Sequence, residues 1–327
     1  MSKVAVITGA GAGVGRAVAE KFAREGYSVA LLSRNEARLQ HTASEFREQY
    51  SVKTLAIAVD VANAQQVADA ASQTERELGP VDVWVNVAMA TVFSPVSGLE
   101  PAEVERATQV TYLGQVYGMM AALRHMRIRN RGSIINVGSA LSHRSVPLQA
   151  AYCGAKSAIR GFTDSLRSEL IHDGLSIQLT MVDLPAVNTP QFDWARNKMH
   201  RKARPVAPVF QPEVAARAVW FAATHKRREV WVGFSTVKAI LANRIAPGLA
   251  DRYLARAGYN GQITNQRLSP DAPDNLFESP DGHWEADGRF NNEAKSSSWQ
   301  MFTERHRNTL WAVTALGVAG LLWRRRK

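Results

Sequence analysis

A tyrosine and a lysine four residues apart are the first residues of this chain whose types and spacing indicate chemistry. Tyr152 and Lys156 both follow Ser139 within one short stretch of sequence. On a helix, residues i and i+4 share one face, which would place the Lys156 ammonium beside the Tyr152 phenol. A nearby cation stabilises phenolate and would lower a pKa that is about 10 in water. We therefore expect Tyr152 to act as a general acid or base near neutral pH, while the Ser139 hydroxyl binds the substrate oxygen.

A glycine-rich turn near the amino terminus indicates what this acid or base works with. The apolar, β-branched run Val4–Ile7 leads into the turn, and a segment with helical periodicity begins at Arg16. Glycines at such a strand–turn–helix junction let the backbone approach a pyrophosphate, and the helix amino terminus offers free N–H groups to it. An ordinary tight turn is the alternative, because glycine is common at turns. The flanking strand and helix favour dinucleotide binding.

Together these motifs resemble those of the short-chain dehydrogenase/reductase family, whose hallmarks are a Thr-Gly-x-x-x-Gly-x-Gly turn and a Ser, Tyr-x-x-x-Lys set. The turn begins here at Thr8, and the resemblance covers roughly residues 1 to 250. It implies a doubly wound α/β domain with a mostly parallel sheet (Rossmann fold), a homodimer or homotetramer, and NAD(P)-dependent transfer of hydride to or from a small-molecule carbonyl or alcohol. It implies a catalytic set of Ser139, Tyr152, Lys156 and Thr111. The implied cofactor-binding residues are Gly9, Gly13, Val14, Gly15, Ser33, Arg34, Asp60, Val61, Asn86, Ala88, Tyr152, Lys156, Pro185 and Thr189.

The order of elements agrees with such a fold. Apolar, β-rich runs alternate with segments long enough for crossover helices, which is typical of a parallel sheet covered on both faces. We expect one catalytic domain over residues 1–258, a polar and partly disordered linker over 259–308, and a hydrophobic segment with a basic end over 309–327. The runs lie at 28–32, 55–59, 81–85, 133–137, 177–182 and 230–232.

The end of the second predicted strand indicates which dinucleotide is used. An acidic residue there would accept hydrogen bonds from the ribose of NAD. This chain instead has Ser33 followed by Arg34, a hydroxyl and a guanidinium that could hold a 2′-phosphate. We therefore predict NADP(H) in preference to NAD(H). The alternative is that Arg34 is a solvated residue at the start of a helix.

Several departures from the family pattern keep a second hypothesis open. Met89 stands where the family has a glycine, and Thr111 replaces an asparagine that normally supports a water in a proton relay. The spacing from Pro185 to Thr189 is one residue short. A non-catalytic NADP(H)-binding sensor or partner protein of the same fold is therefore the alternative to an enzyme.

The overall composition excludes several other classes of site. Cys153 is the only cysteine, so no disulfide can form within the chain, which fits a reducing compartment. The histidines are scattered without metal-ligand spacing, and we expect no metal site. The net charge is +11, but no motif supports nucleic-acid binding. The first predicted strand leaves no room for a signal peptide, so we expect a cytoplasmic protein.

The carboxyl-terminal segment favours contact with a membrane. Residues 310–323 form a charge-free run with tryptophan at both ends, and four basic residues follow it. Fourteen helical residues reach about 21 Å, less than the roughly 30 Å of a hydrocarbon core. A short anchor, a helix in the membrane interface and a helix packed on the domain all remain open. The anchor is the reason to expect a lipophilic substrate. Phe192, Trp194 and Met199 could line its pocket or could be core contacts.

Overall fold

The computed structural model describes residues 2–282 and 284–306. The hydrophobic segment expected over residues 309–327 lies outside this part of the chain. Within the described residues, no helix is both long enough and apolar enough to cross a membrane.

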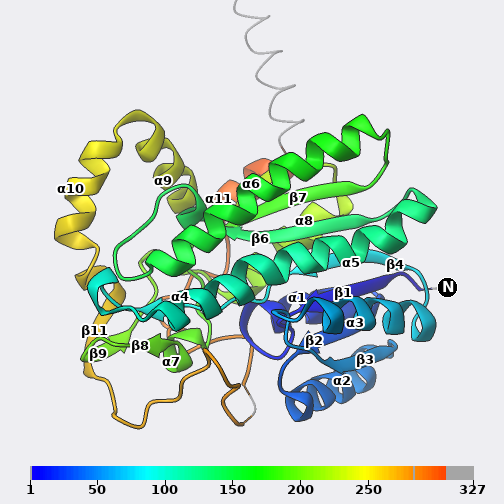
Figure 1. The fold of residues 1–327 in the computed structure, drawn as a ribbon, viewed down its shortest axis with the longest axis horizontal. Helices are drawn as coiled ribbons and strands as arrows, with labels where there is room; N and C mark the ends of the chain where they lie inside the picture. The colour runs from blue at the N-terminus through cyan, green and yellow to red at the C-terminus, as the bar shows by residue number, and fades with distance from the viewer. Residues whose placement is uncertain (1, 283, 307–327) are drawn as a thin grey trace, which may run out of the picture.

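A seven-stranded, wholly parallel sheet forms the centre of the molecule (Figure 1). Its strand order, β10-β7-β6-β4-β1-β2-β3, is that of a doubly wound fold, because the chain winds outwards from β1 in both directions. This confirms the predicted fold class. The strands are β1 (Val4–Thr8), β2 (Ser28–Ser33), β3 (Thr54–Ala58), β4 (Val81–Asn86), β6 (Ser133–Ser139), β7 (Gln178–Leu184) and β10 (Glu229–Trp231).

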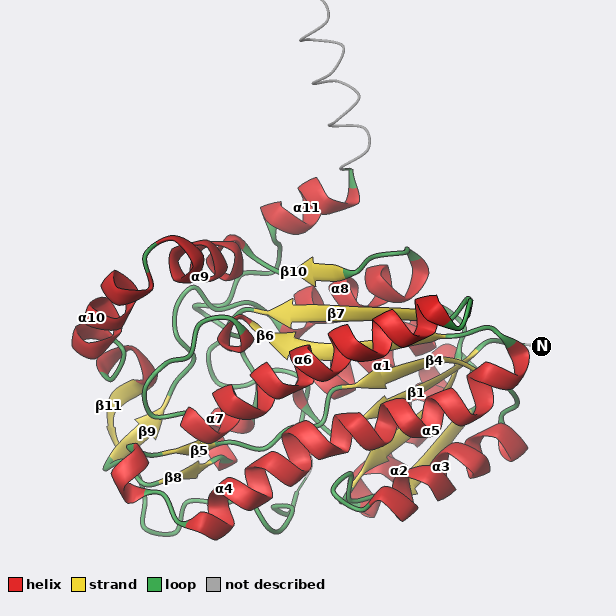
Figure 2. Ribbon diagram, turned by 45° about the horizontal axis from the view of Figure 1, so that its top comes forward, coloured by secondary structure: helices red, strands yellow, loops and turns green. Residues whose placement is uncertain are grey.

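Helices cover both faces of the sheet and create two separate apolar cores (Figure 2). One face carries α1 (Gly13–Arg24), α2 (Glu36–Tyr50) and α8 (Pro212–Thr224). The other carries α3 (Ala64–Glu77), α4 (Pro101–Thr108), α5 (Gly114–Arg129) and α6 (Ala150–His172), and a π-helical turn, η2 (Gln109–Leu113), joins α4 to α5. The strands read as nearly continuous apolar runs because both of their faces are buried.

Asparagine caps start two of the helices that follow strands. Asn35 precedes α2 and accepts a hydrogen bond from the Arg38 amide at 2.9 Å. Asn63 precedes α3 and accepts from the amides of Gln65 and Gln66. Such caps satisfy helix N–H groups that have no partner within the helix. They fix where each helix begins beyond the carboxyl edge of the sheet.

Smaller elements gather beyond the carboxyl ends of the strands, at the left of Figure 2. They comprise η3 (Ala140–Ser142), α7 (Gln191–Trp194), the short strand pairs β5 (Val92–Phe93) with β8 (Arg196–Asn197) and β9 (Arg201–Ala203) with β11 (Ile263–Arg267), and the helix pair α9 (Phe234–Ile245) and α10 (Pro247–Ala257). They surround the edge at which doubly wound folds bind ligands.

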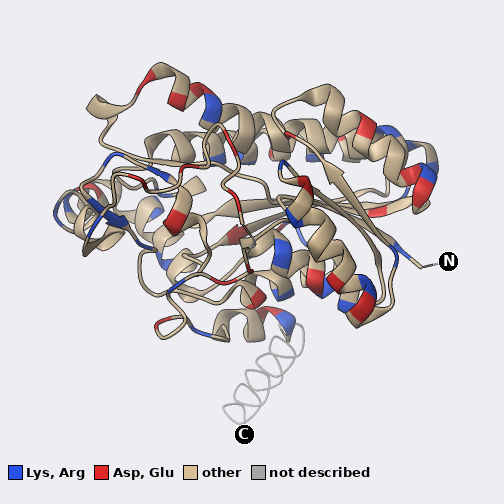
Figure 3. Ribbon diagram, turned by 90° about the horizontal axis from the view of Figure 1, so that it is seen from below, with Lys and Arg blue, Asp and Glu red and all other residues tan. Residues whose placement is uncertain are grey.

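The polar stretch that follows β11 lies along the domain, drawn in orange in Figure 1, before the chain ends its described part in α11 (Trp299–Arg305). Leu276 and Phe290 in this stretch are buried, and Lys295 bonds the Val209 carbonyl through its amide. The stretch therefore packs on the domain although it has little regular secondary structure. Figure 3 shows basic and acidic residues interspersed along the surface helices.

Candidate active site and dinucleotide cleft

A cavity of about 780 Å³ opens at the carboxyl edge of the sheet. It begins at the glycine turn after β1 and passes the ends of β2, β3, β4, β6 and β7 before reaching α9 and α10. The strand order reverses between β1 and β4, which is where a doubly wound sheet leaves a crevice. The cavity is long enough to pass from one half of the sheet to the other.

The glycine turn has the backbone geometry that close approach of a ligand requires. Gly9 and Gly13 have φ angles of +71° and +58°, which side-chain-bearing residues rarely adopt. A Cβ at Gly15 would lie 2.0 Å from the Gly9 carbonyl oxygen. The Thr8 hydroxyl accepts hydrogen bonds from the amides of Val87 at 2.9 Å and Ala88 at 3.2 Å, so the turn is tied to the end of β4. Val14, at the start of α1, also lines the cavity.

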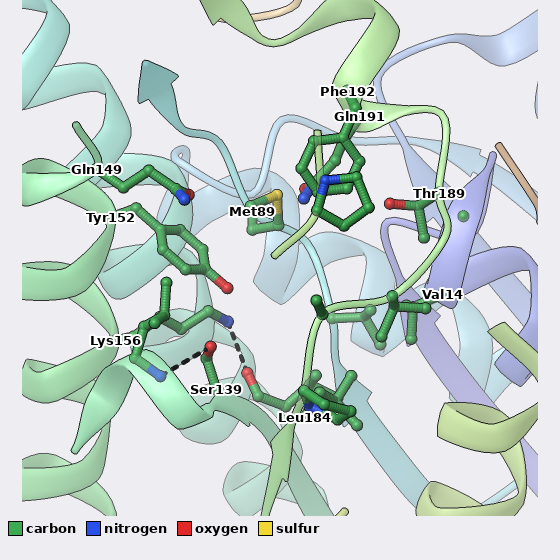
Figure 4. Close-up of a pocket in the computed structure, with 18 of the residues that line it drawn as sticks. Val14, Met89, Ser139, Gln149, Tyr152, Lys156, Leu184, Thr189, Gln191 and Phe192 are labelled. Atoms are coloured by element: carbon green, nitrogen blue, oxygen red, sulfur yellow. Dashed lines mark hydrogen bonds between the residues drawn. The ribbon is translucent and has the colours of Figure 1, made fainter. Parts of the chain in front are cut away.

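Ser139, Tyr152 and Lys156 lie together on one wall of the cavity (Figure 4). Ser139 ends β6, and its hydroxyl accepts from the Leu141 amide at 3.1 Å. Lys156 is 1% exposed, and its Nζ donates to the Val137 carbonyl at 2.6 Å while lying 5.6 Å from the centre of the Tyr152 ring. Thr189 and Val14 lie on the opposite side. The structure thus brings the predicted acid, its lysine and the serine together.

The pKa shifts differ from the sequence-based expectation. Burial raises the pKa of the Tyr152 phenol, and the Ser139 hydroxyl opposes this only in part. Burial also lowers the pKa of Lys156 from 10.5 to about 7, against the opposing charge of Asp183. The expected lowering of the Tyr152 pKa by Lys156 is therefore wrong for this structure. Desolvation of the buried phenol dominates its pKa, and Lys156 donates its hydrogen bond to the Val137 carbonyl.

Two arginines at the end of the cavity beside β2 contact a segment far along the sequence. We call residues 275–282 and 284–285 the strap. Arg34 donates to the carbonyls of Phe277 at 2.8 Å and Asn275 at 2.6 Å. Arg38 donates to the carbonyls of Gly282 at 3.0 Å and Pro280. The strap therefore closes the side of the cleft where a nucleotide would be held, and it adds Asn275, Ser279 and Pro280 to the lining.

The strap also reaches the glycine turn. The Gly13 amide donates to the Glu285 carbonyl at 3.1 Å, and the Glu285 carboxylate lies 3.0 Å from Arg16. In contrast, the Ser33 hydroxyl lines the cavity and is buried without a hydrogen-bond partner among the described residues. A buried polar group normally has a partner, so this hydroxyl fits a polar atom of a ligand.

The remaining predicted cofactor residues divide into two groups. The first group lines the cavity and comprises Asp60, Val61, Ala88, Pro185 and Thr189. The Asp60 carboxylate also lies 2.6 Å from Arg106. Asn86 does not line it: its buried amide accepts from Trp84 and donates to Asn136 inside the sheet. Its placement gives it a role in joining β4 to β6 and no contact with the cavity.

Thr111 also lies away from the cavity. Its buried hydroxyl accepts from the Ala90 amide at 2.8 Å and donates to the Ala90 carbonyl at 2.9 Å. Both bonds hold the loop after β4 against η2. These bonds use the donor and one of the two acceptor lone pairs of the hydroxyl, and its part in a proton relay stays a prediction. Of the three predicted apolar contacts, Phe192 and Trp194 line the cavity, while Met199 packs beside Phe93, Ala195 and Ala203.

Sequence reasoning missed Arg38, Gln149 and the strap. Arg38 lies in the first turn of α2, four residues after Arg34, so its basic side chain close behind the end of β2 was a usable signal. Gln149 precedes α6 and lines the cavity near Tyr152 (Figure 4). The strap has a polar composition that is typical of a linker, and its binding groups are main-chain carbonyls, which no side-chain pattern reveals.

Comparisons with known proteins agree on one family. A family model described as short chain dehydrogenase matches residues 3–200. An uncharacterized oxidoreductase of Bacillus subtilis, YxnA, is 28% identical over 322 residues, which are 98% of this chain and 89% of that protein. The 2-(R)-hydroxypropyl-CoM dehydrogenase of Xanthobacter autotrophicus is 31% identical over 67% of this chain and 88% of that protein.

A solved structure is similar as well. It is an alcohol dehydrogenase from the archaeon Thermococcus sibiricus, complexed with 5-hydroxy-NADP. It is 27% identical and superposes with a TM-score of 0.62, covering 71% of this chain and 96% of that one.

Proposed function

The chain belongs to the short-chain dehydrogenase family and is an NAD(P)-dependent oxidoreductase, and we propose that it transfers hydride between NADP(H) and a lipophilic carbonyl or alcohol with Tyr152 as the general acid or base. The observation that carries this proposal is the convergence of Tyr152, Ser139 and Lys156 on a cavity that continues to the glycine turn. A bound nicotinamide supplies or accepts the hydride. The chain supplies the proton and holds the substrate oxygen.

Each of the three side chains has a separate task in this proposal. The phenol of Tyr152 donates a proton to the substrate oxygen during reduction and accepts it during oxidation. The Ser139 hydroxyl donates a hydrogen bond to the same oxygen. The Lys156 ammonium stabilises the phenolate, which is needed more strongly here because burial raises the pKa of Tyr152. A substrate oxygen between Ser139 and Tyr152 would replace part of the solvation that the phenol has lost.

The preference for NADP(H) rests on groups at the end of β2. The buried Ser33 hydroxyl has no partner, and the Arg34 and Arg38 guanidiniums line the same part of the cavity. A 2′-phosphate accepts hydrogen bonds from hydroxyl and guanidinium donors together. The charge of Arg34 faces the strap carbonyls, so binding of the phosphate would compete with or rearrange those bonds.

A lipophilic substrate is favoured by the mouth of the cavity. α9 and α10 line this end with three alanines, Tyr253 and Leu254 beside Ser235 and Lys238, and Val206 faces it as well. A mostly apolar lining with a few polar groups is typical of sites for lipophilic ligands. Association with a membrane through residues 309–327 would deliver such substrates, and it is tested by comparing sedimentation of the full chain with that of a chain ending at residue 306.

The test is a titration of the full chain with NADPH and NADH, followed by turnover with a panel of lipophilic and polar carbonyls. We expect tighter binding of NADPH and oxidation of NADPH with lipophilic carbonyls. Tyr152→Phe is the matched control, because it removes only the phenolic hydroxyl and keeps the ring. It should reduce turnover by at least about 10²-fold, the usual contribution of general acid catalysis, with cofactor affinity nearly unchanged. Binding without turnover would favour the sensor or partner hypothesis.

A further inference from the structure

A buried carboxylate lies on the strand next to the one that carries Ser139. Asp183 on β7 is fully buried and pairs in register with Gly138 on β6. Paired residues of neighbouring strands point to the same face of a sheet. Asn136, two residues before Gly138, bonds Thr163 of α6, so this is the face that α6 covers. The Asp183 carboxylate therefore shares a sheet face with the helix that carries Tyr152 and Lys156.

Gly138 makes the space for this carboxylate. A Cβ built at Gly138 would lie 2.3 Å from Asp183 Oδ1, so any side chain there would displace the carboxylate. The conformation of Gly138 does not demand a glycine, since its φ lies outside the left-handed region. The glycine is needed for room. It allows a negative charge to approach the backbone between Val137, whose carbonyl accepts from Lys156, and Ser139.

The hydrogen bonding of Asp183 is incomplete. Its Oδ2 lies 2.9 Å from His143 Nε2, but its Oδ1 is buried and has no partner in the part of the chain that the structure describes. Burial raises the pKa of Asp183, and the bond from His143 is the main opposing influence. A carboxylate with one side unpaired is poorly screened, so its charge acts on neighbouring groups through a medium of low dielectric.

The charged groups that face Asp183 come from three elements. His143 follows η3, Glu229 lies on β10, and Arg160 and Lys156 lie one turn apart on α6. Lys156 bonds a main-chain carbonyl and has lost its water, so it depends on nearby negative charge to remain protonated. The charge of Asp183 opposes the lowering of the Lys156 pKa that burial causes.

We propose that Asp183, supported by His143, is a positioning residue that holds Lys156 in its ammonium form within the buried site. This inference rests on the proposed function, in which the ammonium stabilises the Tyr152 phenolate. Among the described residues the Asp183 side chain forms no hydrogen bond with Tyr152 or Lys156, and it acts on Lys156 through its charge. The same carboxylate would also keep the phenol protonated when no substrate is bound, because its charge raises the pKa of Tyr152.

A divalent cation is the competing occupant of this region. Donor atoms of His143, Asp183 and Glu229 lie within 4.8 Å of one another. The hydrogen-bonded arrangement is favoured because Glu229 Oε2 already accepts from Trp231 Nε1 at 3.0 Å, and Glu229 lies 3.7 Å from Arg228. The experiments below include EDTA for this reason.

The first experiment measures kcat/KM for NADPH-dependent reduction between pH 6 and pH 9. Activity should fall as Lys156 loses its proton, and Asp183→Asn should move this fall to lower pH by about one pH unit. At pH 8 the variant should lose about tenfold relative to the unchanged chain, with little loss at pH 6. Asp164→Asn is the matched control, since it removes a partly exposed carboxylate elsewhere on α6 and should leave the profile in place.

The second experiment does not need turnover. NMR of the free protein labelled with ¹⁵N-lysine follows the titration of Lys156, assigned with Lys156→Arg. We expect a midpoint about one pH unit lower in Asp183→Asn. An unchanged midpoint overturns the inference. So does a midpoint that EDTA moves in the unchanged chain, because a metal would then hold the carboxylate. If no carbonyl is reduced, the proposed function fails while the NMR titration still decides the role of Asp183.

A further variant guards against a folding defect in Asp183→Asn. His143→Leu removes the one hydrogen bond that supports the carboxylate, so Asp183 should take up a proton more readily. The Lys156 midpoint should then fall in the same direction by a smaller amount. A rise in the midpoint would contradict the proposal.

Discussion

Replacement of Lys156 by methionine should stabilise the fold while it destroys the site. Methionine has a similar length and no charge, so the substitution removes the cost of burying an ammonium and preserves most of the packing. The pKa of Lys156 falls from 10.5 to about 7 on folding. Each unit corresponds to about 1.4 kcal/mol, which gives a cost of about 4 kcal/mol at pH 7. Loss of the bond to the Val137 carbonyl offsets about 1 kcal/mol of the gain.

The pH dependence gives this prediction its sign. Between pH 7 and 10.5 the unfolded chain binds more protons at Lys156 than the folded one does, so the unchanged protein gains stability as pH rises. Lys156→Met cannot gain in this way. The free energy of unfolding of Lys156→Met should exceed that of the unchanged chain by about 3 kcal/mol at pH 7. This difference should fall nearly to zero by pH 9.5.

The assay is denaturation by urea at both pH values, with midpoints and slopes compared. Lys53→Met is the matched control, because Lys53 is exposed and should give a small difference that does not change with pH. If Lys156→Met is less stable than the unchanged chain at pH 7, or if its advantage does not decline with pH, the reasoning about the buried ammonium fails.

Three further predictions concern the dinucleotide cleft. Ser33→Asp with Arg34→Ala should reverse the preference from NADPH to NADH, because an acid would bond the ribose hydroxyl and no guanidinium would hold the phosphate; the ratio of dissociation constants from fluorescence titration measures this. Gly15→Ala should abolish measurable NADPH binding by fluorescence, since its Cβ would lie 2.0 Å from the Gly9 carbonyl oxygen; retained affinity would show that the turn is not the pyrophosphate site. NADPH should slow proteolysis within the strap, because Ser279 and Pro280 line the cleft; equal cleavage rates with and without NADPH would show that the strap does not contact the nucleotide.

The fold could be predicted closely from the local pattern of apolar residues in the sequence. Each apolar run predicted as a strand lies in the central sheet within a residue or two of its expected bounds, because a strand buried on both faces is mostly apolar. The meeting of Ser139, Tyr152 and Lys156 was predictable for the same reason. Strand ends and helix starts converge at one edge of a parallel sheet, so residues placed there come together.

The features of the site that could not be predicted from the sequence depend on long-range contacts. The packing of the strap on Arg34 is made by main-chain carbonyls some 240 residues away, and carbonyls leave no trace in a sequence. The sign of the Tyr152 shift depended on a balance between burial and charge that only coordinates provide. Asn86 and Thr111 had suitable residue types, but each bonds neighbouring groups of the protein and is absent from the cavity lining.

The central claim is that Tyr152 completes a hydride transfer from the nicotinamide to a carbonyl. The most direct measurement uses NADPH that carries deuterium at both C4 positions, with a lipophilic carbonyl, and follows the alcohol product by mass spectrometry. We predict one deuterium on the carbinol carbon with the unchanged chain and no labelled alcohol with Tyr152→Phe, although both proteins bind NADPH. Labelled alcohol formed at equal rates by both would contradict the role of Tyr152, and bound NADPH that never transfers its label would contradict catalysis at this site.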